Sequence, residues 1–221
     1  MYPVCLDING KLCVIIGGGR VAERKVKGLL DSGAYIRVIS PEVTDELARL
    51  AEEGRIDWRK KSYRYDDLHK GWLVFAATNQ REIQELICRQ AGENGQLINV
   101  VDDPECCNFH VPATVRRGDL TLAVSTNGKS PAVSAMIRKQ LEGLFGHEYE
   151  VLLNVMAMIR RQAVTESASQ ADRKRIYKKI LHKDIIEWIR AGKMNRLQDH
   201  LRDILGSEVD LDLSELKPEI S

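Results

Sequence analysis

The chain of 221 residues lacks any long hydrophobic run, and no apolar stretch approaches the ~20 residues that a membrane-spanning helix needs. It also lacks the basic flank and long apolar region of a signal peptide, because Met1 leads directly into YPVCLDI. Net charge is almost absent, since 33 basic and 32 acidic residues leave a formal charge of +1. We therefore expect a cytoplasmic protein with no overall electrostatic attraction to nucleic acid or to a membrane surface.

Cysteine is scarce and shows no ligand spacing. Five cysteines without a C-x-x-C pair fit reduced thiols better than a disulfide framework. Cys5, Cys13 and Cys88 lie in apolar patterns and are interpreted as core residues. The segment 105–110, ECCNFH, carries ligand-type side chains, but adjacent cysteines do not easily share one tetrahedral metal ion. We therefore predict no bound metal.

Glycine is concentrated where a strand meets a helix. The apolar, β-branched run 12–16 predicts a central parallel strand. Gly17, Gly19 and Ala22 then fit G-x-G-x-x-A, in which the first glycine makes the turn and the second lets the backbone approach a pyrophosphate. The following helix start presents unpaired N–H groups and a positive dipole to that phosphate. This pattern predicts a dinucleotide-binding turn, and the alternative is a purely structural glycine turn.

The residues after this turn alternate between strand and helix patterns, which predicts an α/β, Rossmann-type parallel sheet covered by helices on both faces. A hairpin-like start is also expected over 3–16, because Asn9-Gly10 separates two apolar runs. The expected later strands are 35–40, 56–61, 72–76 and 97–101, and the expected helices are 20–32, 44–53 and 80–94.

The pattern changes after Cys107. Two antiparallel strands, 111–116 and 120–125, are expected around an Arg-Gly-Asp turn, and Ser130 is expected to cap a helix that runs from Pro131 to about residue 144. A strand pair with one helix is too small for an independent core, so this unit is expected to pack on a second copy.

The remaining chain reads as helical from 147 to 206, with an acidic end that is predicted to be a loose tail. The predicted organisation is therefore a Rossmann domain, then a small α+β dimerisation unit, then a C-terminal helical domain. Their predicted bounds are 1–112, 113–146 and 147–221.

Polar residues follow the expected strands of the first domain, at the sheet edge where α/β folds bind ligands. Asp102 is the best catalytic candidate, as a general base beside a nicotinamide ring. The alternative for Asp102 and Asp103, which precede Pro104, is turn chemistry. In the AATN segment, Thr78 and Asn79 either contact a ligand or cap the next helix, and both interpretations stay open.

The segment STNGKSP places hydroxyl, amide and ammonium groups just before a helix start. Thr126, Asn127, Lys129 and Ser130 suit the carboxylates or phosphates of a ligand, and the alternative is a helix cap beside a solvated lysine. Arg116 is a further candidate for an anionic group.

One feature departs from the dinucleotide pattern. The second strand is expected to end in Asp or Glu, which binds the ribose, but the sequence there is Ile39-Ser40-Pro41-Glu42. The spacing alone therefore leaves NAD and NADP as alternatives.

Four segments together resemble the precorrin-2 dehydrogenase module of the siroheme synthase family: GGGRVAERKVKGLLDSGA, AATN, INVVDDPECCNFHVPA and LTLAVSTNGKSPAVSAMIRKQLE. The resemblance covers residues 3 to about 205. It implies a homodimeric enzyme of siroheme biosynthesis that removes two hydrogens from the tetrapyrrole precorrin-2, reduces NAD and yields sirohydrochlorin. One alternative is a bifunctional enzyme that also inserts ferrous iron, and a second is a non-catalytic NAD-sensing module.

The resemblance also implies site residues. The family's essential aspartate falls on Asp102, and the serine beside its tetrapyrrole site falls on Thr126, which keeps the hydroxyl but adds a methyl group. Because precorrin-2 carries eight carboxylates, the predicted substrate-binding residues are Thr126, Asn127, Lys129, Ser130 and Arg116. The predicted cofactor-binding residues are Gly17, Gly18, Gly19, Arg20, Val21, Pro41, Glu42 and Thr78.

Overall fold

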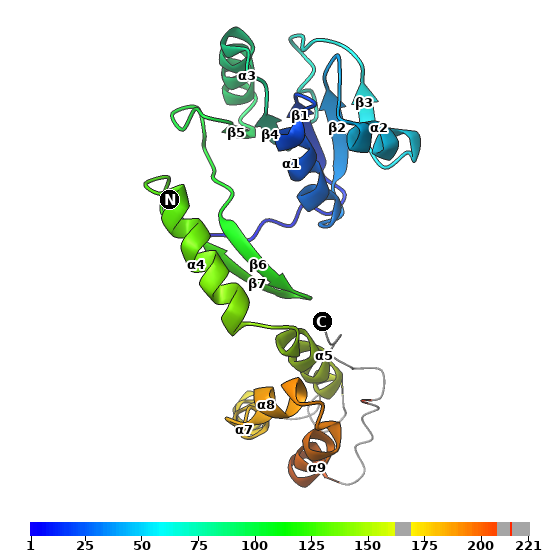
Figure 1. Ribbon diagram of the computed structural model, residues 1–221, viewed down its shortest axis with the longest axis vertical. Coiled ribbons are helices and arrows are strands. Elements are labelled where there is room, and N and C mark those ends of the chain that lie inside the picture. The colour runs from blue at the N-terminus through cyan, green and yellow to red at the C-terminus, as the bar shows by residue number, and fades with distance from the viewer. Residues whose placement is uncertain (162–168, 207–212, 214–221) are drawn as a thin grey trace. The chain divides into compact units, whose positions relative to one another are not determined.

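The computed structural model describes residues 1–161, 169–206 and Leu213 (Figure 1). The chain divides into two compact units, Met1–Val111 and Pro112–Ser221. No helix among the described residues combines the length and apolarity that crossing a membrane requires.

The first unit is built on a five-stranded sheet in the order β3-β2-β1-β4-β5, in which every neighbouring pair is parallel. Two successive connections lead outward from β1 on one side, and β4 then begins on its other side. The carboxyl ends of β1 and β4 therefore flank the point where the strand order reverses, which is where such sheets bind ligands. The strands are β1 (Leu12–Ile16), β2 (Tyr35–Ile39), β3 (Asp57–Arg59), β4 (Leu73–Ala76) and β5 (Leu97–Val100).

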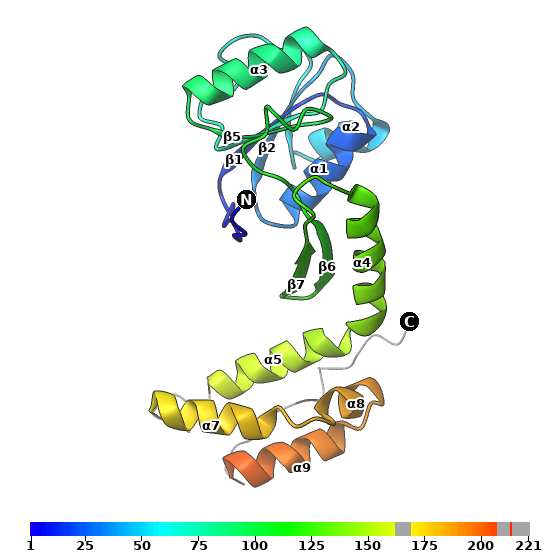
Figure 2. The ribbon, with the colours of Figure 1, turned by 90° about the vertical axis from the view of Figure 1, so that its left-hand side faces the viewer.

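Helices cover both faces of this sheet because alternate residues of β1 enter two different cores. Cys13 and Ile15 pack with α1 (Arg20–Leu30) and α2 (Asp45–Glu52), whereas Val14 and Ile16 pack with α3 (Arg81–Glu93). Figure 2 shows α3 on one side of the sheet and α1 on the other. The apolar run therefore lies between two helical layers, as the sequence predicts.

The predicted hairpin over residues 3–16 is wrong. β1 is paired in parallel with β2 on one edge and β4 on the other, so no edge is left for an antiparallel strand. Residues 1–8 form no strand, although Asn9-Gly10 does make a turn in which the Gly10 N–H donates to the Gly33 carbonyl at 2.9 Å.

The prediction that all the thiols are reduced is also wrong. Cys88 of α3 forms a disulfide with Cys106, in the segment that follows β5. Cys13 is a buried core thiol as predicted, but Cys5 is exposed because the segment before β1 does not join the sheet. The pairing joins residues 18 positions apart, a proximity that no Cys spacing motif signals.

The second unit begins with an antiparallel hairpin of β6 (Ala113–Arg117) and β7 (Leu120–Val124), which turns at Gly118-Asp119. Helix α4 (Pro131–Leu144) contacts both strands. Ser130 caps this helix as predicted, since its hydroxyl accepts from the Val133 N–H at 3.3 Å.

Helices α5, α7, α8 and α9 follow and share a separate apolar core with Leu213. The predicted loose tail and residues 162–168 lie outside the described residues, apart from Leu213. The fold class is confirmed. From residue 12 to residue 144 the predicted elements agree with the observed ones to within two residues at each end. The region 147–206 was predicted as helical throughout, and its described residues form four separate helices. The helices are α5 (Glu148–Arg160), α7 (Gln170–Ile180), α8 (Ile185–Arg190) and α9 (Met194–Leu205).

A buried carboxylate joins α5 to α8. The side chain of Glu148 is only 7% exposed, and its Oε1 accepts from Arg190 at 2.5 Å and from the Gly146 N–H at 3.3 Å. Burial by itself raises the pKa of Glu148, but the hydrogen bonds from Arg190 and from backbone N–H groups outweigh it and hold the pKa below its ordinary value.

We predict that this carboxylate makes the stability of the helical core depend on pH. Because the pKa is lower in the folded state, the stabilisation is present above the ordinary Glu pKa and is lost as the pH falls through the folded pKa. Glu148→Gln should lower the free energy of unfolding at pH 7 by about 1 to 2 kcal/mol, a modest value because Arg190 is mostly exposed.

Denaturant unfolding of the wild type and the variant at pH 7 and pH 3 checks this prediction. The matched control is Glu85→Gln, whose partner Arg81 and own side chain are both exposed, and we expect a change below about 0.5 kcal/mol. An equal effect of Glu148→Gln at both pH values would contradict the assignment.

Candidate functional site

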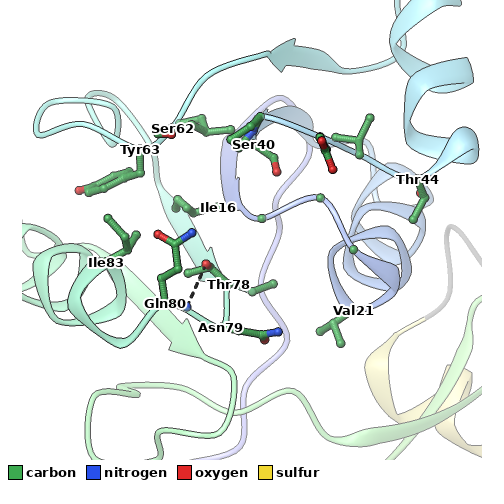
Figure 3. Close-up of a pocket in the computed structure, with 18 of the residues that line it drawn as sticks. Ile16, Val21, Ser40, Thr44, Ser62, Tyr63, Thr78, Asn79, Gln80 and Ile83 are labelled. Carbon is green, nitrogen blue, oxygen red and sulfur yellow. Dashed lines mark hydrogen bonds between the residues drawn. The ribbon is translucent and has the colours of Figure 1, made fainter.

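The glycine turn after β1 forms one wall of a pocket of about 590 Å³, a volume within the range of small-molecule sites. The pocket lies at the carboxyl ends of the central strands, as the sequence predicts. Figure 3 shows Tyr63, Gln80 and Ile83 at one end and Val21 and Thr44 at the other. All the predicted cofactor-binding residues line it, namely Gly17, Gly18, Gly19, Arg20, Val21, Pro41, Glu42 and Thr78.

The three glycines of the turn have different roles. Gly17 has φ +115°, and a Cβ there would lie 2.1 Å from the Ala77 carbonyl oxygen. A Cβ at Gly18 would lie 2.0 Å from the Glu42 carbonyl oxygen. A Cβ at Gly19 would meet nothing within 4 Å. The first two glycines therefore let the turn pack against neighbouring loops, whereas Gly19 leaves its backbone open to a ligand.

Helix α1 starts at this open backbone. Gly19 is its N-cap and supplies no side-chain hydrogen bond, so the first-turn N–H groups have no partner within the helix or from the cap side chain. Together with the helix dipole, these groups suit a phosphate. Arg20 and Glu42 carry the charged side chains among the lining residues. The donor set therefore fits the pyrophosphate of a dinucleotide.

The loop after β2 packs against the glycine turn, lines the pocket as well, and is fixed at both ends. The Trp58 indole N–H donates to the Ser40 carbonyl at 3.0 Å, and the Thr44 N–H donates to the Gly18 carbonyl at 2.9 Å. Glu42 lies between these points and is exposed. The first acidic residue after β2 is therefore Glu42 on this loop, two positions later than the dinucleotide pattern places it.

Several lining residues were missed from the sequence. Ser62 and Tyr63 follow β3, so the same rule on strand ends points to them. The Tyr63 hydroxyl donates to Gln90, and burial raises its pKa to about 12, so it stays protonated at neutral pH. Ile83 lies inside α3, and no local signal distinguishes it from any other apolar helical residue. Asn79, the second polar residue of the AATN segment, also lines the pocket, and the other missed lining residues with polar side chains are Ser40, Thr44 and Gln80.

The side chain of Gln84, also missed, ties the ends of β4 and β5 together. Its Nε2 donates to the carbonyls of Thr78 at 2.7 Å and Val101 at 3.4 Å. Asp102 comes directly after Val101, is exposed and has φ +63°. It is not among the lining residues, and Val101 before it is joined to the lining residue Thr78 through the side chain of Gln84.

Thr78 lines the pocket but is not the N-cap of α3. Its Oγ1 accepts from the Gln80 N–H at 3.3 Å, just before the helix begins. The N-cap of α3 is Gln80, whose own side chain makes no cap hydrogen bond.

The segment after Asp102 is a compact turn. Asp103 accepts from the Cys106 N–H at 3.4 Å, which confirms the turn role expected for it. The Cys107 sulfur accepts from the Val100 N–H at 3.1 Å, and burial raises the pKa of this thiol. Nowhere in residues 1–161 and 169–206 do three His, Cys, Asp or Glu side chains come together as ligands for a metal ion.

In the second unit, hydrogen bonds hold the segment 125–131 against the start of α4. The Thr126 hydroxyl accepts from the Ser130 N–H at 3.1 Å and lies 3.2 Å from the Ser134 hydroxyl. The hydroxyls of Thr126 and Ser130 therefore shape the loop and cap the helix. Asn127, with φ +52°, and Lys129 are exposed and face solvent.

Arg116 lies apart from this loop. It pairs with Thr121, whereas the strand positions next to the loop are Ala113 and Val124, three residues along β6. At ~3.3 Å per residue this places the two about 10 Å apart along the hairpin. The structure thus brings together the four candidates of the loop but not Arg116.

Comparison with known proteins agrees with this geometry. Residues 4–113 match a family described as putative NAD(P)-binding, and residues 117–144 match one described as sirohaem biosynthesis protein central. A solved structure titled SirC, precorrin-2 dehydrogenase, has a TM-score of 0.78 and 26% sequence identity, and the match covers 92% of this chain and 98% of that chain.

Curated relatives include siroheme synthase 1 of Aeromonas salmonicida, 34% identical over 93% of this chain, and siroheme synthase of Nitrosomonas eutropha, 35% identical over 95%. The match covers 44% of each relative, so the chain spans less than half of their length.

We predict that alanine substitutions separate the roles of Gly17 and Gly19. Gly17→Ala should cost about 3 kcal/mol or more of stability, because of its positive φ and the contact with the Ala77 carbonyl. Gly19→Ala should cost about 1 kcal/mol or less, because its backbone is extended and its surroundings are open.

Thermal unfolding and NAD+ titration check this pair. Gly19→Ala should weaken NAD+ binding by about tenfold while the protein stays folded. Unchanged NAD+ binding by a folded Gly19→Ala variant would contradict the placement of the dinucleotide at this turn.

Proposed function

The chain belongs to the siroheme synthase family, and on that premise we propose that it catalyses the NAD-dependent dehydrogenation of precorrin-2 to sirohydrochlorin. The observation that carries the proposal is the similarity, over nearly the whole length of both chains, to a solved protein titled precorrin-2 dehydrogenase. The dinucleotide-type pocket is what a hydride-transfer reaction of this kind requires.

The reaction divides into a hydride and a proton. Precorrin-2 gives up two hydrogens, of which NAD+ accepts one as a hydride and a base accepts the other as a proton, so that sirohydrochlorin, NADH and H+ result. The protein's part is to hold the dinucleotide, place the reacting carbon beside it and take the proton. In this assignment the backbone of Gly19 and the start of α1 hold the pyrophosphate, and Glu42 contacts the ribose.

Asp102 is the proposed base. Its carboxylate is exposed at the carboxyl end of β5, and its φ of +63° is a conformation that Asp adopts more readily than most residues. Such backbone conformations are frequent where a structure fixes the direction of a functional side chain.

The charges of the pocket favour NAD over NADP. Glu42 is an exposed carboxylate on the loop after β2, which is the loop that meets the adenosine ribose in this fold. A carboxylate there accepts a hydrogen bond from the 2′-hydroxyl and repels a 2′-phosphate. Arg20, on α1, is the one cation among the lining residues.

For the tetrapyrrole, the exposed side chains of Asn127 and Lys129 are the proposed contacts for substrate carboxylates. Thr126 and Ser130 support them by holding the loop against α4. Arg116, on the exposed edge of the same unit, is proposed to meet a more distant carboxylate of this broad substrate.

Asp102→Asn should reduce the turnover of precorrin-2 by about 100- to 10,000-fold, the usual effect of losing a general base. Asparagine keeps the size of the side chain and tolerates positive φ, so the fold should stay intact. NAD+ affinity should stay within about twofold, because Asp102 does not line the pocket. NADH absorbance measures the turnover, and calorimetry measures the binding.

Asp66→Asn is the matched control. Asp66 is also exposed and has positive φ, at +77°, but it lies in the connection between β3 and β4 and not among the lining residues. It should keep wild-type turnover. Full turnover by Asp102→Asn would contradict its role as the base. A wild type that binds NAD+ but produces no NADH from precorrin-2 would instead favour an NAD-sensing module.

We also propose that the protein is a homodimer that pairs through α4. Val133, Met136 and Leu144 are 41%, 55% and 63% exposed and recur at helical spacing, so α4 presents an apolar face that its own hairpin does not cover. The hairpin with α4 has little core of its own, which a second copy would extend.

Met136→Glu should therefore convert the protein from a dimer to a monomer of 25.0 kDa in sedimentation equilibrium, because it places a charge in the middle of this face. Leu86→Glu is the control, since Leu86 is similarly exposed, at 41%, but lies on α3. A wild type that sediments as a monomer would overturn the proposal.

A further inference from the structure

The hydroxyl of Thr44 joins the two helices that flank the pocket. It donates to Oε2 of Glu23, on α1, at 2.8 Å, and it accepts from the Leu47 N–H, in the first turn of α2, at 3.4 Å. Glu23 itself does not line the pocket, whereas Thr44 does. The carboxylate of Glu23 therefore reaches the pocket only through Thr44.

The same residue fixes the wall that carries Glu42. The Thr44 N–H donates to the Gly18 carbonyl at 2.9 Å, and the Glu42 carbonyl packs so closely on Gly18 that no Cβ fits between them. Thr44 is thus bonded at its backbone to the glycine turn and at its side chain to the helix that begins there. The position of Glu42, two residues earlier, depends on both bonds.

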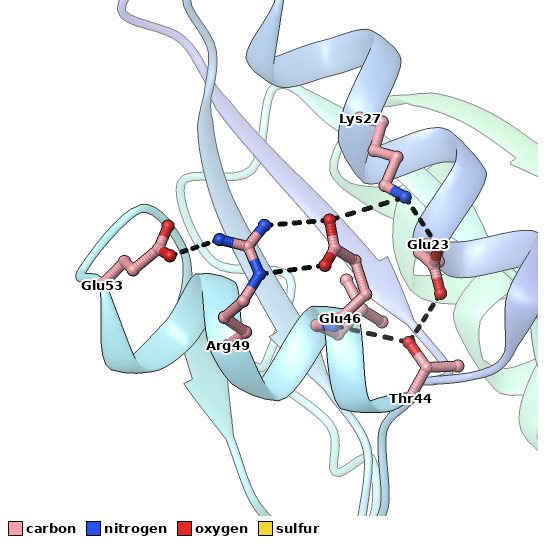
Figure 4. Close-up of polar contacts among 7 residues, drawn as sticks. Glu23, Lys27, Thr44, Glu46, Arg49 and Glu53 are labelled. Carbon is pink, nitrogen blue, oxygen red and sulfur yellow. Dashed lines mark hydrogen bonds and ion pairs between the residues drawn. The ribbon is translucent and has the colours of Figure 1, made fainter.

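Glu23 is held in place from its other side. Its Oε1 accepts from Lys27 at 2.8 Å, and Lys27 also lies 3.5 Å from Glu46, which receives two hydrogen bonds from Arg49 (Figure 4). Hydrogen bonds from Lys27 and Thr44 lower the pKa of Glu23, so this carboxylate is ionised at neutral pH. An ionised acceptor makes the stronger hydrogen bond with the Thr44 hydroxyl.

We propose that Glu23 is a positioning residue for the dinucleotide: by holding the Thr44 hydroxyl, it fixes the loop 40–44 against the glycine turn and so sets where Glu42 meets the ribose. This inference rests on the proposed function, because it assumes that the ribose lies beside Glu42. It assigns to Glu23 a part in the choice between NAD and NADP, although Glu23 touches neither.

The geometry separates this role from ordinary helix capping. The cap of α2 is the bond from the Leu47 N–H to Thr44 Oγ1, and it does not involve Glu23. Removing the Glu23 carboxylate therefore leaves the cap in place and releases only the tie to α1. A purely structural role of Glu23 would change stability without changing the preference between the two dinucleotides.

The test compares Glu23→Ala, Glu23→Gln, Thr44→Val and Thr44→Ser in the full chain by titration with NAD+ and NADP+. Glu23→Ala and Thr44→Val should each weaken NAD+ binding about five- to tenfold and NADP+ binding much less, so the preference for NAD+ should fall. Glu23→Gln and Thr44→Ser keep an acceptor and a hydroxyl, and should stay within about twofold of wild type.

A double variant and a control sharpen the test. Glu23→Ala combined with Thr44→Val should bind NAD+ no more weakly than the weaker single variant, because both remove the same bond. Glu53→Ala, at the far end of the network where Glu53 accepts from Arg49, should bind NAD+ as the wild type does (Figure 4). In turnover assays, Glu23→Ala should raise KM for NAD+ and leave kcat within about twofold.

The outcomes separate this inference from the proposed function. Unchanged NAD+ and NADP+ binding by a folded Glu23→Ala variant would overturn the inference, as would an equal loss with Glu23→Gln. A wild type that binds neither dinucleotide would contradict the proposed function itself.

Discussion

The close contact between the glycine turn and the loops after β2 and β4 is the constraint on which the rest of the first unit depends. Gly17 and Gly18 leave no space for a Cβ against the carbonyls of Ala77 and Glu42. These contacts fix how the carboxyl ends of β1, β2 and β4 lie relative to one another. Strand β1 lies at the centre, because it is buried and is paired with a neighbour on each edge. Only with that arrangement do the backbone of Gly19 and the loop with Glu42 face one pocket.

Polar groups of the pocket in the first unit, and of the loop 125–131 in the second unit, fall into two kinds. The first kind makes hydrogen bonds within the protein. The hydroxyls of Thr44 and Ser130 cap helices, and that of Thr126 bonds within its loop. The side chain of Gln84 joins the ends of two strands. The other kind is exposed, as are Asp102 and Glu42. Where a group of the first kind holds the segment that carries one of the second, as Thr44 does for the loop with Glu42, a residue that touches no ligand is expected to affect binding.

The fold was largely predictable because its signals are local. Apolar β-branched runs, capping residues such as Thr44 and Ser130, and Pro131 at a helix start each act within a few residues. The predictions of the hairpin and of the reduced thiols were wrong because both outcomes depend on residues that are distant in the sequence. The apolar run before Asn9-Gly10 fits a strand, but both edges of β1 are occupied. The pairing of Cys88 with Cys106 depends on α3 lying beside the segment after β5, and no Cys spacing reveals that.

By itself, the sequence determined the Rossmann-type alternation, the glycine turn, the cofactor candidates and Asp102 as the carboxylate after β5, because strand ends and turn glycines are marked by residue type and spacing. Only the tertiary structure decided which side chains share the pocket. It added Tyr63 and Ile83 from distant segments, showed the hydroxyl of Thr126 to be engaged within its loop, and separated Arg116 from that loop along the hairpin. The physical reason is that the spacing of residues determines only which face or end of one helix or strand a side chain occupies. A site also requires several such elements to pack against one another.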